Sequence, residues 1–377
     1  MELKKIHISD IGKIVTGKTP RTSVAENYDG YIPFLTPSDD LSHKSAPKTT
    51  KTLTEQGLNE VRNCLLPSRS ICVSCIGSDL GKVVMTKEPT VTNQQFNSII
   101  PNKNFNADFV YYFMTLVGRE LNYLSKTSTA VPIINKSSFS NYEIEVPDLE
   151  TQNRIASILS SIDSKIELNR RINDNLEEQA KALFKSWFVD SDRNEWVHYE
   201  LGDITLITAG GDRPSKYTNK KTIECYVPIY SNGIDNEGLY GYTDVAKIHE
   251  ESITISARGT IGYVCLRLEP YVPIVRLISI IPNKKELSAK YLYLWALTQN
   301  ITGTGTTQQQ LTVPIFRKTP ISIPSDTKLK QFNSIADPLF SQIESNKKEN
   351  IKLSTLRDTL LPKLMSGELS VEEVSLD

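Results

Sequence analysis

Residues 12–19 carry a pattern that could bind a nucleotide phosphate. They read GKIVTGKT, which matches the phosphate-binding P-loop at each of its fixed positions. That chemistry requires a buried strand before the loop and a helix that starts at Lys18 and Thr19. Residues 7–10 are too polar for a central strand, and Pro20 follows the pattern directly. We therefore expect a turn here, with a P-loop nucleotide hydrolase as the alternative function.

Cys72 and Cys75, with Cys64 nearby, have a spacing found in metal sites. A structural zinc ion needs about four ligands, and no second cysteine pair or spaced histidine partner is close. The odd total of five cysteines indicates a reducing compartment rather than a disulfide framework. We expect buried strand cysteines, no metal, no cofactor in this chain and no catalytic residues.

A set of polar residues on or beside predicted turns has side chains suited to DNA. Lysine and arginine bind phosphates or guanine, and carboxamides bind adenine edges. The set comprises Lys18, Thr19, Arg21, Asn93, Gln94, Gln95, Arg213, Ser215, Lys216, Arg258 and Arg276. Residues 308–310, three glutamines, form another carboxamide cluster, near Lys126. Each residue taken singly is typical of an ordinary solvated surface. Their recurrence on equivalent turns favours DNA binding.

The positions of these turns depend on one long helix, predicted over residues 148–190. This stretch contains no glycine or proline, and Asp148 after Pro147 is a suitable N-cap. Apolar residues recur in alternating steps of three and four, a heptad seam that predicts packing against another helix. The seam consists of Leu159, Ile162, Ile166, Asn169, Asn173, Leu176, Ala180, Leu183 and Trp187.

The partner helix is predicted in the same chain. Pro324 follows Pro147 by 177 positions, and that shift carries the seam onto Ala336, Leu339, Ile343, Asn346, Asn350, Leu353, Arg357, Leu360 and Leu364. A buried asparagine fixes register, because it needs a polar group opposite. An antiparallel pair brings Asn169 to Asn350 and Asn173 to Asn346 together. A seam of this length spans roughly 50 Å at 1.5 Å per residue, about one and a half turns of duplex at roughly 34–36 Å each.

The segments outside the helices also repeat, with offsets that drift between 181 and 195. For example, Ile71-x-x-Ser74-x-x-Gly77 recurs as Ile253-x-x-Ser256-x-x-Gly259, whereas Lys18-Thr19 becomes Asp212-Arg213. Loops tolerate such insertions. The predicted fold is α+β, with two mixed α/β domains related by pseudo-twofold symmetry and separated by two long helices in an antiparallel coiled coil. The expected boundaries are a first globular domain at 1–147, a helix at 148–190, a second globular domain at 191–324, a helix at 325–366 and a tail at 367–377.

Four apolar residues of the first helix lie outside its seam: Leu168, Ile172, Phe184 and Phe188. They either pack against the chain's own globular domains or form a site for a partner protein. Composition does not decide the function. Hydrophobic residues make up 39% and charged residues 23%, the net charge is −1, and no run approaches the length of a membrane span.

Several segments resemble the specificity subunit of type I restriction–modification systems. They are residues 146–169, where Pro147, Leu149, Glu150 and Gln152 precede the seam, and residues 184–188 (FKSWF), 201–204 (LGDI) and 360–369 (LLPKLMSGEL). The resemblance covers nearly the whole chain. It implies that the two globular domains are target-recognition domains, each of which reads one half of a bipartite, asymmetric sequence in double-stranded DNA.

The resemblance also implies a set of partners. The helices would set the spacer and dock two modification (methyltransferase) subunits that hold S-adenosylmethionine, in a prokaryotic cytoplasm. A restriction subunit would use ATP. A coiled-coil scaffold that binds only proteins is the second alternative.

Overall fold

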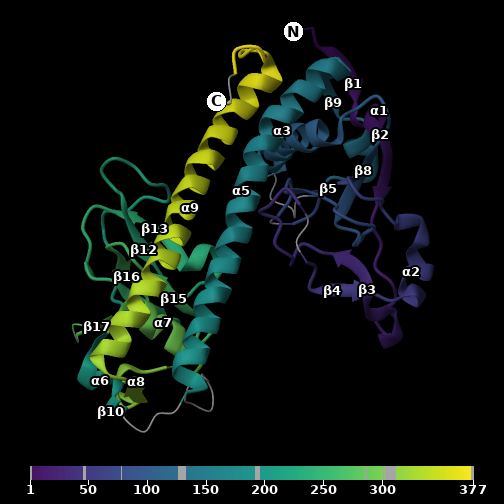
Figure 1. Ribbon diagram of the computed structural model, residues 1–377. Helices are drawn as coiled ribbons and strands as arrows, with labels where there is room; N and C mark the ends of the chain where they lie inside the picture. Colours follow the sequence, from purple (N-terminus) through teal and green to yellow (C-terminus); the bar gives the residue numbers. More distant parts are fainter. Residues whose placement is uncertain are drawn as a thin grey trace. The chain divides into compact units, whose positions relative to one another are not determined.

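The computed structural model describes residues 2–45, 48–77, 79–125, 133–191, 196–283, 285, 287–299, 301 and 311–374. The chain divides into two compact units (Figure 1). The first unit comprises Met1–Asn169 and Lys348–Asp377, and the second comprises Arg170–Lys347. Each unit therefore contains one globular part and a segment of each long helix.

The first unit is built on three small sheets and four helices, of which the long α3 is amphipathic. A four-stranded antiparallel sheet has the order β2-β8-β5-β6, a three-stranded sheet has the order β4-β3-β7, and β1 pairs with β9. The strands are β1 (Lys4–His7), β2 (Gly12–Thr16), β3 (Tyr28–Leu35), β4 (Lys51–Leu53), β5 (Ile71–Ser74), β6 (Val83–Met85), β7 (Val91–Thr92), β8 (Phe96–Pro101) and β9 (Glu143–Val146). The helices are α1 (Ile8–Ile11), α2 (Glu55–Val61), α3 (Ala107–Ser125) and α4 (Lys136–Ser140), with 3-10 turns at Ala25–Asn27 and Arg62–Cys64.

The second unit repeats this plan with the same sheet orders. Its four-stranded sheet is β11-β17-β14-β15, its three-stranded sheet is β13-β12-β16, and β10 pairs with β18. The strands are β10 (Val197–Glu200), β11 (Thr205–Ala209), β12 (Val227–Tyr230), β13 (Leu239–Thr243), β14 (Ser252–Ile255), β15 (Val264–Arg267), β16 (Val272–Pro273), β17 (Ile278–Pro282) and β18 (Pro320–Ile323). The helices are α6 (Leu201–Ile204), α7 (Ala289–Leu297) and α8 (Val313–Arg317), with a 3-10 turn at Asp235–Gly238. The duplication expected from the sequence is thus a duplication of topology.

The two long helices are α5 (Leu149–Phe184) and α9 (Asp326–Ser366). Asp148 caps α5 as predicted, because its Oδ1 accepts a hydrogen bond from the Thr151 amide at 2.8 Å. The end of α5 differs from the prediction. Residues 185–189 form a π-helical turn, closed by a 2.9 Å bond from the Asp190 amide to the Lys185 carbonyl.

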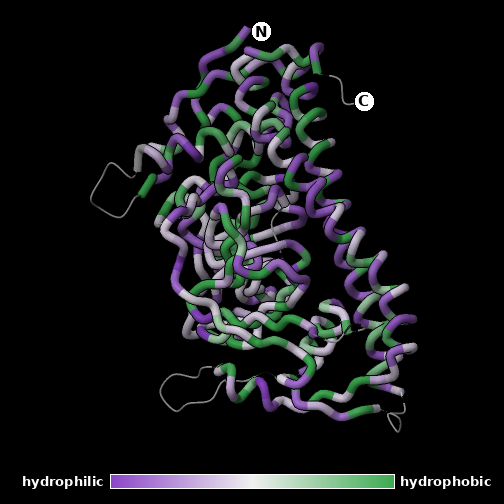
Figure 2. Tube along the Cα trace, turned by 90° about the vertical axis from the view of Figure 1, so that its left-hand side faces the viewer, coloured by the Kyte–Doolittle hydropathy of each residue, from purple (hydrophilic) through white to green (hydrophobic). Residues whose placement is uncertain are grey.

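The seam residues bring α5 and α9 together in antiparallel directions (Figure 1). In the first unit, Asn169 Nδ2 donates to Asn350 Oδ1 at 2.9 Å. In the second, Asn346 Nδ2 donates to Asn173 Oδ1 at 2.8 Å, and Asn173 Nδ2 donates to the carbonyl of Ile343. Hydrophobic and hydrophilic residues alternate along both helices, as expected of a packed seam (Figure 2). The antiparallel coiled coil predicted from the sequence is confirmed.

The seam departs from its prediction near the end of α9. Leu361 and Leu364 are buried there, whereas Leu360 is only half-buried. The reason is that this part of α9 also packs against the core of the first globular part. Arg357, at a predicted apolar position, donates to Asp163 of α5 at 2.7 Å, so the charge on the seam is paired.

Candidate nucleic-acid interface

Residues 12–19 do not form a phosphate-binding loop. Gly12–Thr16 is strand β2, and the described residues that follow it up to Val24 form no helix. The amide of Gly17 donates to the Phe96 carbonyl at 3.1 Å, and the amide of Lys18 donates to the Thr92 carbonyl at 2.9 Å. These two amides are occupied within the fold, so they cannot surround a phosphate as a P-loop does. The nucleotide-hydrolase alternative therefore loses its structural basis.

The paired cysteines lie in the interior of the first unit. Cys72 is within β5, Cys75 follows it, and both are buried. Burial raises the pKa of the Cys72 thiol to about 12 and that of Cys75 to about 11. Among the residues that the structure describes, no three His, Cys, Asp or Glu side chains are grouped to hold a metal ion.

The first unit brings two predicted clusters together. Thr19 Oγ1 donates to Gln94 Oε1 at 2.7 Å, which joins the turn after β2 to the turn before β8. Asn93 is 9% exposed and donates from Nδ2 to Gln95 Oε1 at 2.9 Å. Asn93 thus orients Gln95 rather than facing solvent. Lys18, Thr19, Gln94 and Gln95 form one edge of the unit, which we call the first loop edge.

Arg21, also predicted to contact DNA, is held by Glu60 of α2. Its guanidinium donates to Glu60 Oε1 from Nη2 at 2.7 Å and from Nε at 2.9 Å, and its amide donates to Oε2 at 3.0 Å. These hydrogen bonds lower the pKa of Glu60 to about 2 and raise the pKa of Arg21. Arg21 thereby fixes the turn to α2, and its charge is already paired before any phosphate approaches.

The second unit has an equivalent edge with different side chains. The amides of Val275 and Arg276 donate to the carbonyls of Gly211 and Gly210 at 2.9 and 3.0 Å, which places the loop before β17 beside the turn after β11. Arg213 follows that turn, and its guanidinium lies over the Tyr217 ring at 4.0 Å.

Tyr240 also holds Arg213, since its hydroxyl accepts a hydrogen bond from Nη1 at 2.9 Å. Ser215 is exposed, and Lys216 pairs with Asp244 and Glu224 at 3.3 and 3.4 Å. Lys216 thus resembles Arg21 in having its charge matched within the unit.

Asn232 is a residue of this edge that the sequence analysis missed. Its Oδ1 accepts the Ala257 amide at 2.8 Å, and its Nδ2 donates to the Val275 carbonyl at 2.6 Å. Because Arg258 and Arg276 follow these two partners in the chain, Asn232 ties their loops together. We call Arg213, Arg258, Val275 and Arg276 the second loop edge. A lone asparagine after a strand gives no local signal of such a bridge.

The four apolar residues of α5 divide into two groups. Phe184 and Phe188 are 3% and 1% exposed and pack with Tyr291 and Phe332 at ring distances of 5.0 to 6.1 Å. They therefore belong to the core of the second unit and offer no surface to a partner. Leu168 and Ile172 are 51% and 38% exposed.

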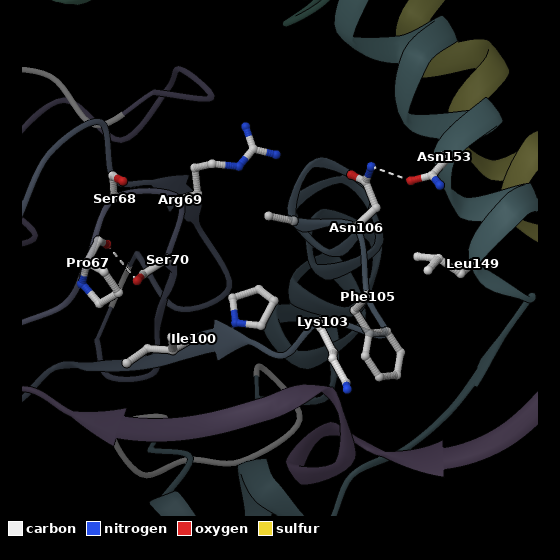
Figure 3. A pocket seen from close by; sticks show the side chains of 12 residues that line it. Pro67, Ser68, Arg69, Ser70, Ile100, Lys103, Phe105, Asn106, Leu149 and Asn153 are labelled. Atoms are coloured by element: carbon white, nitrogen blue, oxygen red, sulfur yellow. Dashed lines mark hydrogen bonds between the residues drawn. The ribbon is translucent and has the colours of Figure 1, made fainter.

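A polar pocket of about 490 Å³ lies in the first unit, away from the loop edge (Figure 3). Asn106 Nδ2 donates to Asn153 Oδ1 at 2.7 Å across it, and the Asn106 amide donates to Gln152 Oε1. Arg69 lines the pocket but pairs with Asp108 at 2.6 Å. Asn106, directly before α3, and Asn153 of α5 thus join the two helices at this pocket. Residues 308–310 and Lys126, the remaining predicted cluster, lie outside the described residues.

None of the described helices combines the length and apolar character needed to cross a membrane.

Comparison with known proteins agrees with this architecture. A crystal structure of the S subunit of a type I restriction–modification system from M. genitalium aligns with a TM-score of 0.56 at 18% identity, over 97% of this chain and 96% of the other, and so has the same fold. The MjaIX type I restriction enzyme specificity subunit of Methanocaldococcus jannaschii is 29% identical over 99% of this chain and 94% of its own length. A putative type I specificity subunit of Mycoplasma pneumoniae is 31% identical over 64% of this chain and 75% of its own length.

The profile of one family matches the chain twice, once for each half of the duplication. It is described as the type I restriction modification DNA specificity domain, and it covers residues 1–178 and 193–355. The chain therefore belongs to the family of type I restriction–modification DNA specificity proteins and carries two copies of the family's domain.

Proposed function

We propose that this chain is the DNA sequence-specificity subunit of a type I restriction–modification complex. Each globular part reads one half of a bipartite target, and the coiled coil sets the number of unread base pairs between the halves. The observation that carries the proposal is the pair of loop edges, which lie at equivalent places in the duplicated topology and carry different side chains. In the first unit the turn after β2 meets the loop before β8, and in the second the turn after β11 meets the loop before β17.

The chemistry of the two edges differs in a way that suits two different half-sequences. The first edge presents Gln94 and Gln95, whose carboxamides can bond an adenine edge. The second presents Arg258 and Arg276, whose guanidinium groups match the two acceptors of guanine. Lys18 and Arg213 are placed to approach the phosphate backbone at the two edges. An asymmetric target follows from this difference.

The long helices supply the spacer. α5 is 36 residues long, and its direction and register against α9 are fixed by asparagine pairs in both units. A polar pair in a helix seam is satisfied only by its correct partner, so it selects one register at some cost in stability. A register defined in this way gives the spacer one length.

The chain needs partners for catalysis. Two modification subunits, which would carry S-adenosylmethionine, dock on the helices, and exposed Leu168 and Ile172 of α5 are candidates for part of that contact. The resemblance also implies a restriction subunit as a further member of the complex. The rival function, a coiled-coil scaffold without DNA readout, gives no reason for two duplicated edges with different polar side chains.

An insertion tests the spacer directly. One heptad is added to α5 after Asn169 and one to α9 before Asn350, positions that face each other in the seam register near the boundary between the two units. The reconstituted complex should then select targets whose spacer is longer by about three base pairs, because seven residues add roughly 10 Å. The half-sequences should stay the same. A heptad in α5 alone breaks the register and is the control. Altered half-sequences with an unchanged spacer would refute the role of the helices.

A further inference from the structure

The second loop edge ends in a strained tip at Val275 and Arg276. Their φ angles are +51° and +65°, in the left-handed region that β-branched residues rarely adopt. Backbone bonds to Gly210 and Gly211, and from the Leu277 amide to the Ile274 carbonyl, hold the tip in this conformation. Val275 is 51% exposed, so the strain does not serve to bury it. Strain that the surrounding structure maintains often marks a functional element.

Asn232 fixes this tip from the neighbouring loop. Its side chain uses both its acceptor and its donor, on the Ala257 amide and the Val275 carbonyl. A residue with only one of these groups can satisfy only one of the two loops. The amide side chain is therefore chemically matched to the bridging position.

The loop that carries Asn232 is anchored in turn. The Ser231 amide donates to the Gly238 carbonyl at 2.8 Å, which closes the loop, and Asn236 and Glu237 have φ angles of +48° and +57°. Arg267, whose side chain is 3% exposed, donates from Nη2 to the Glu237 carbonyl at 2.6 Å. Lys347 of α9 binds Glu237 Oε1 at 2.8 Å. The position of Asn232 is thereby linked to the coiled coil within the second unit.

The first unit has a turn at the equivalent place, closed by a 3.2 Å bond from the Phe96 amide to the Asn93 carbonyl. Gln94 and Gln95 precede Val275 and Arg276 by 181 positions, and Asn93 holds Gln95 by a side-chain hydrogen bond. The turn thus occupies the same place in both copies, but Gln94 and Gln95 do not share the positive φ angles of Val275 and Arg276. The side chains change from two carboxamides to one aliphatic group and one guanidinium. A turn that keeps its place in the fold and changes in conformation and side chains suits an element that reads a different half-sequence in each unit.

We propose that Val275 and Arg276 are the base-reading tip of the second globular part and that Asn232 is its positioning residue. Arg276 bonds O6 and N7 of a guanine, and the methyl groups of Val275 contact the C5-methyl group of a thymine in the same half-sequence. The inference rests on the proposed function, since it names the residues through which the second half is read.

The test measures modification of a duplex library by the chain reconstituted with methyltransferase subunits, with each base pair of both halves randomised in turn. Arg276→Ala should reduce discrimination at a guanine position by roughly ten- to a hundredfold. Val275→Gly should reduce discrimination at a thymine position. Because glycine adopts a positive φ readily, this loss of discrimination could not be attributed to unfolding. Val245→Ala is the matched control, because Val245 is 69% exposed in the same unit and lies outside the second loop edge.

Asn232 is tested by two variants. Asn232→Ala should reduce base discrimination at the guanine position and at the thymine position alike. Asn232→Asp keeps the acceptor for Ala257 and loses the donor for Val275, so it should disturb those positions almost as much. Discrimination in the half read by the first unit should stay unchanged, whereas a general structural defect of the chain would reduce it in both halves.

The possible outcomes distinguish a failure of the proposed tip from a failure of the proposed DNA-specificity function. If the variants modify DNA with an unchanged base preference in both halves, the base-reading role of Val275 and Arg276 is refuted. The proposed function of the whole chain then still stands. A wild-type complex without any sequence preference would instead refute the proposed function.

Discussion

Asp108 and Lys290 occupy equivalent positions, the second residue of α3 and of α7, and carry opposite charges. Asp108 binds Arg69 at 2.6 Å and Lys44 at 2.8 Å, whereas Lys290 binds Glu251 at 2.8 Å and Asp337 at 3.2 Å. Arg69 and Glu251 are also equivalent positions, because Glu251 follows Arg69 by 182 residues, just as Lys290 follows Asp108. The duplicated units thus keep the ion pair and reverse its polarity. A helix from one unit would meet like charges on the sheet of the other, which favours correct pairing within each unit.

Reversing the charge of Asp108 should therefore destabilise the first unit. Asp108→Lys places three cations together. The Arg69 side chain is 57% exposed and those of Asp108 and Lys44 are partly buried, so the cost should be about 1–2 kcal/mol, between that of a surface pair and that of a buried one. The double variant Asp108→Lys with Arg69→Glu reproduces the polarity of the second unit and should recover part of the loss. Urea unfolding measures both. Equal stability of the single and double variants would show that the pair does not matter.

The contact between Arg21 and Glu60 should survive in acid. Hydrogen bonds from Arg21 lower the pKa of Glu60 to about 2 in the folded state, from about 4.5 when unpaired. A carboxyl whose folded pKa is lowered contributes stability that is present above the unfolded value and lost as the pH falls towards the folded value. Stability from this pair should therefore decline between pH 4.5 and 2. NMR titration of the Glu60 carboxyl checks the value, with Arg21→Ala as the control that should return it to the usual range.

Cys72 and Cys75 should be chemically inert in the native protein. Burial raises their pKa values to about 12 and 11, so almost no thiolate is present at pH 8. Iodoacetamide should modify them in urea and leave them intact under native conditions, as mass spectrometry would show. Rapid native alkylation would mean that β5 is more accessible than the structure has it.

The asparagine pair of the first unit should be coupled. Asn169→Leu leaves Oδ1 of half-buried Asn350 without its donor, although Asn350 Nδ2 keeps the Ile166 carbonyl, and should cost about 1 kcal/mol. Adding Asn350→Leu should restore most of that stability, since two leucines can pack in the seam. Unfolding of the two single variants and the double variant gives the coupling energy. Additive effects would argue that the hydrogen bond at 2.9 Å does not define the register.

The sequence reveals the features that depend on periodicity. The constant shift of 177 residues predicts the seam of α9 from that of α5. The pairing of Asn169 with Asn350 follows because a buried amide needs a polar partner. The fold is visible for the same reason, because strand and helix patterns recur in both halves.

Features that depend on contacts distant in the chain are not visible in the sequence. Arg21 is charged and lies beside a turn, and only the fold shows that Glu60, 39 residues away, already binds it. The positive φ of Val275 follows from loop contacts, because valine by itself disfavours that conformation. Phe184 and Phe188 pack into the core of the second unit, and Phe188 does so from a π-helical turn that the heptad pattern does not predict.

Selection of duplexes from a random library by the reconstituted complex tests the account most directly. Sequencing of the retained DNA should show two short, different blocks of fixed sequence separated by a spacer of constant length and free composition. A single continuous block, two identical blocks, or no enrichment would contradict the claim that the two globular parts read different halves of one target.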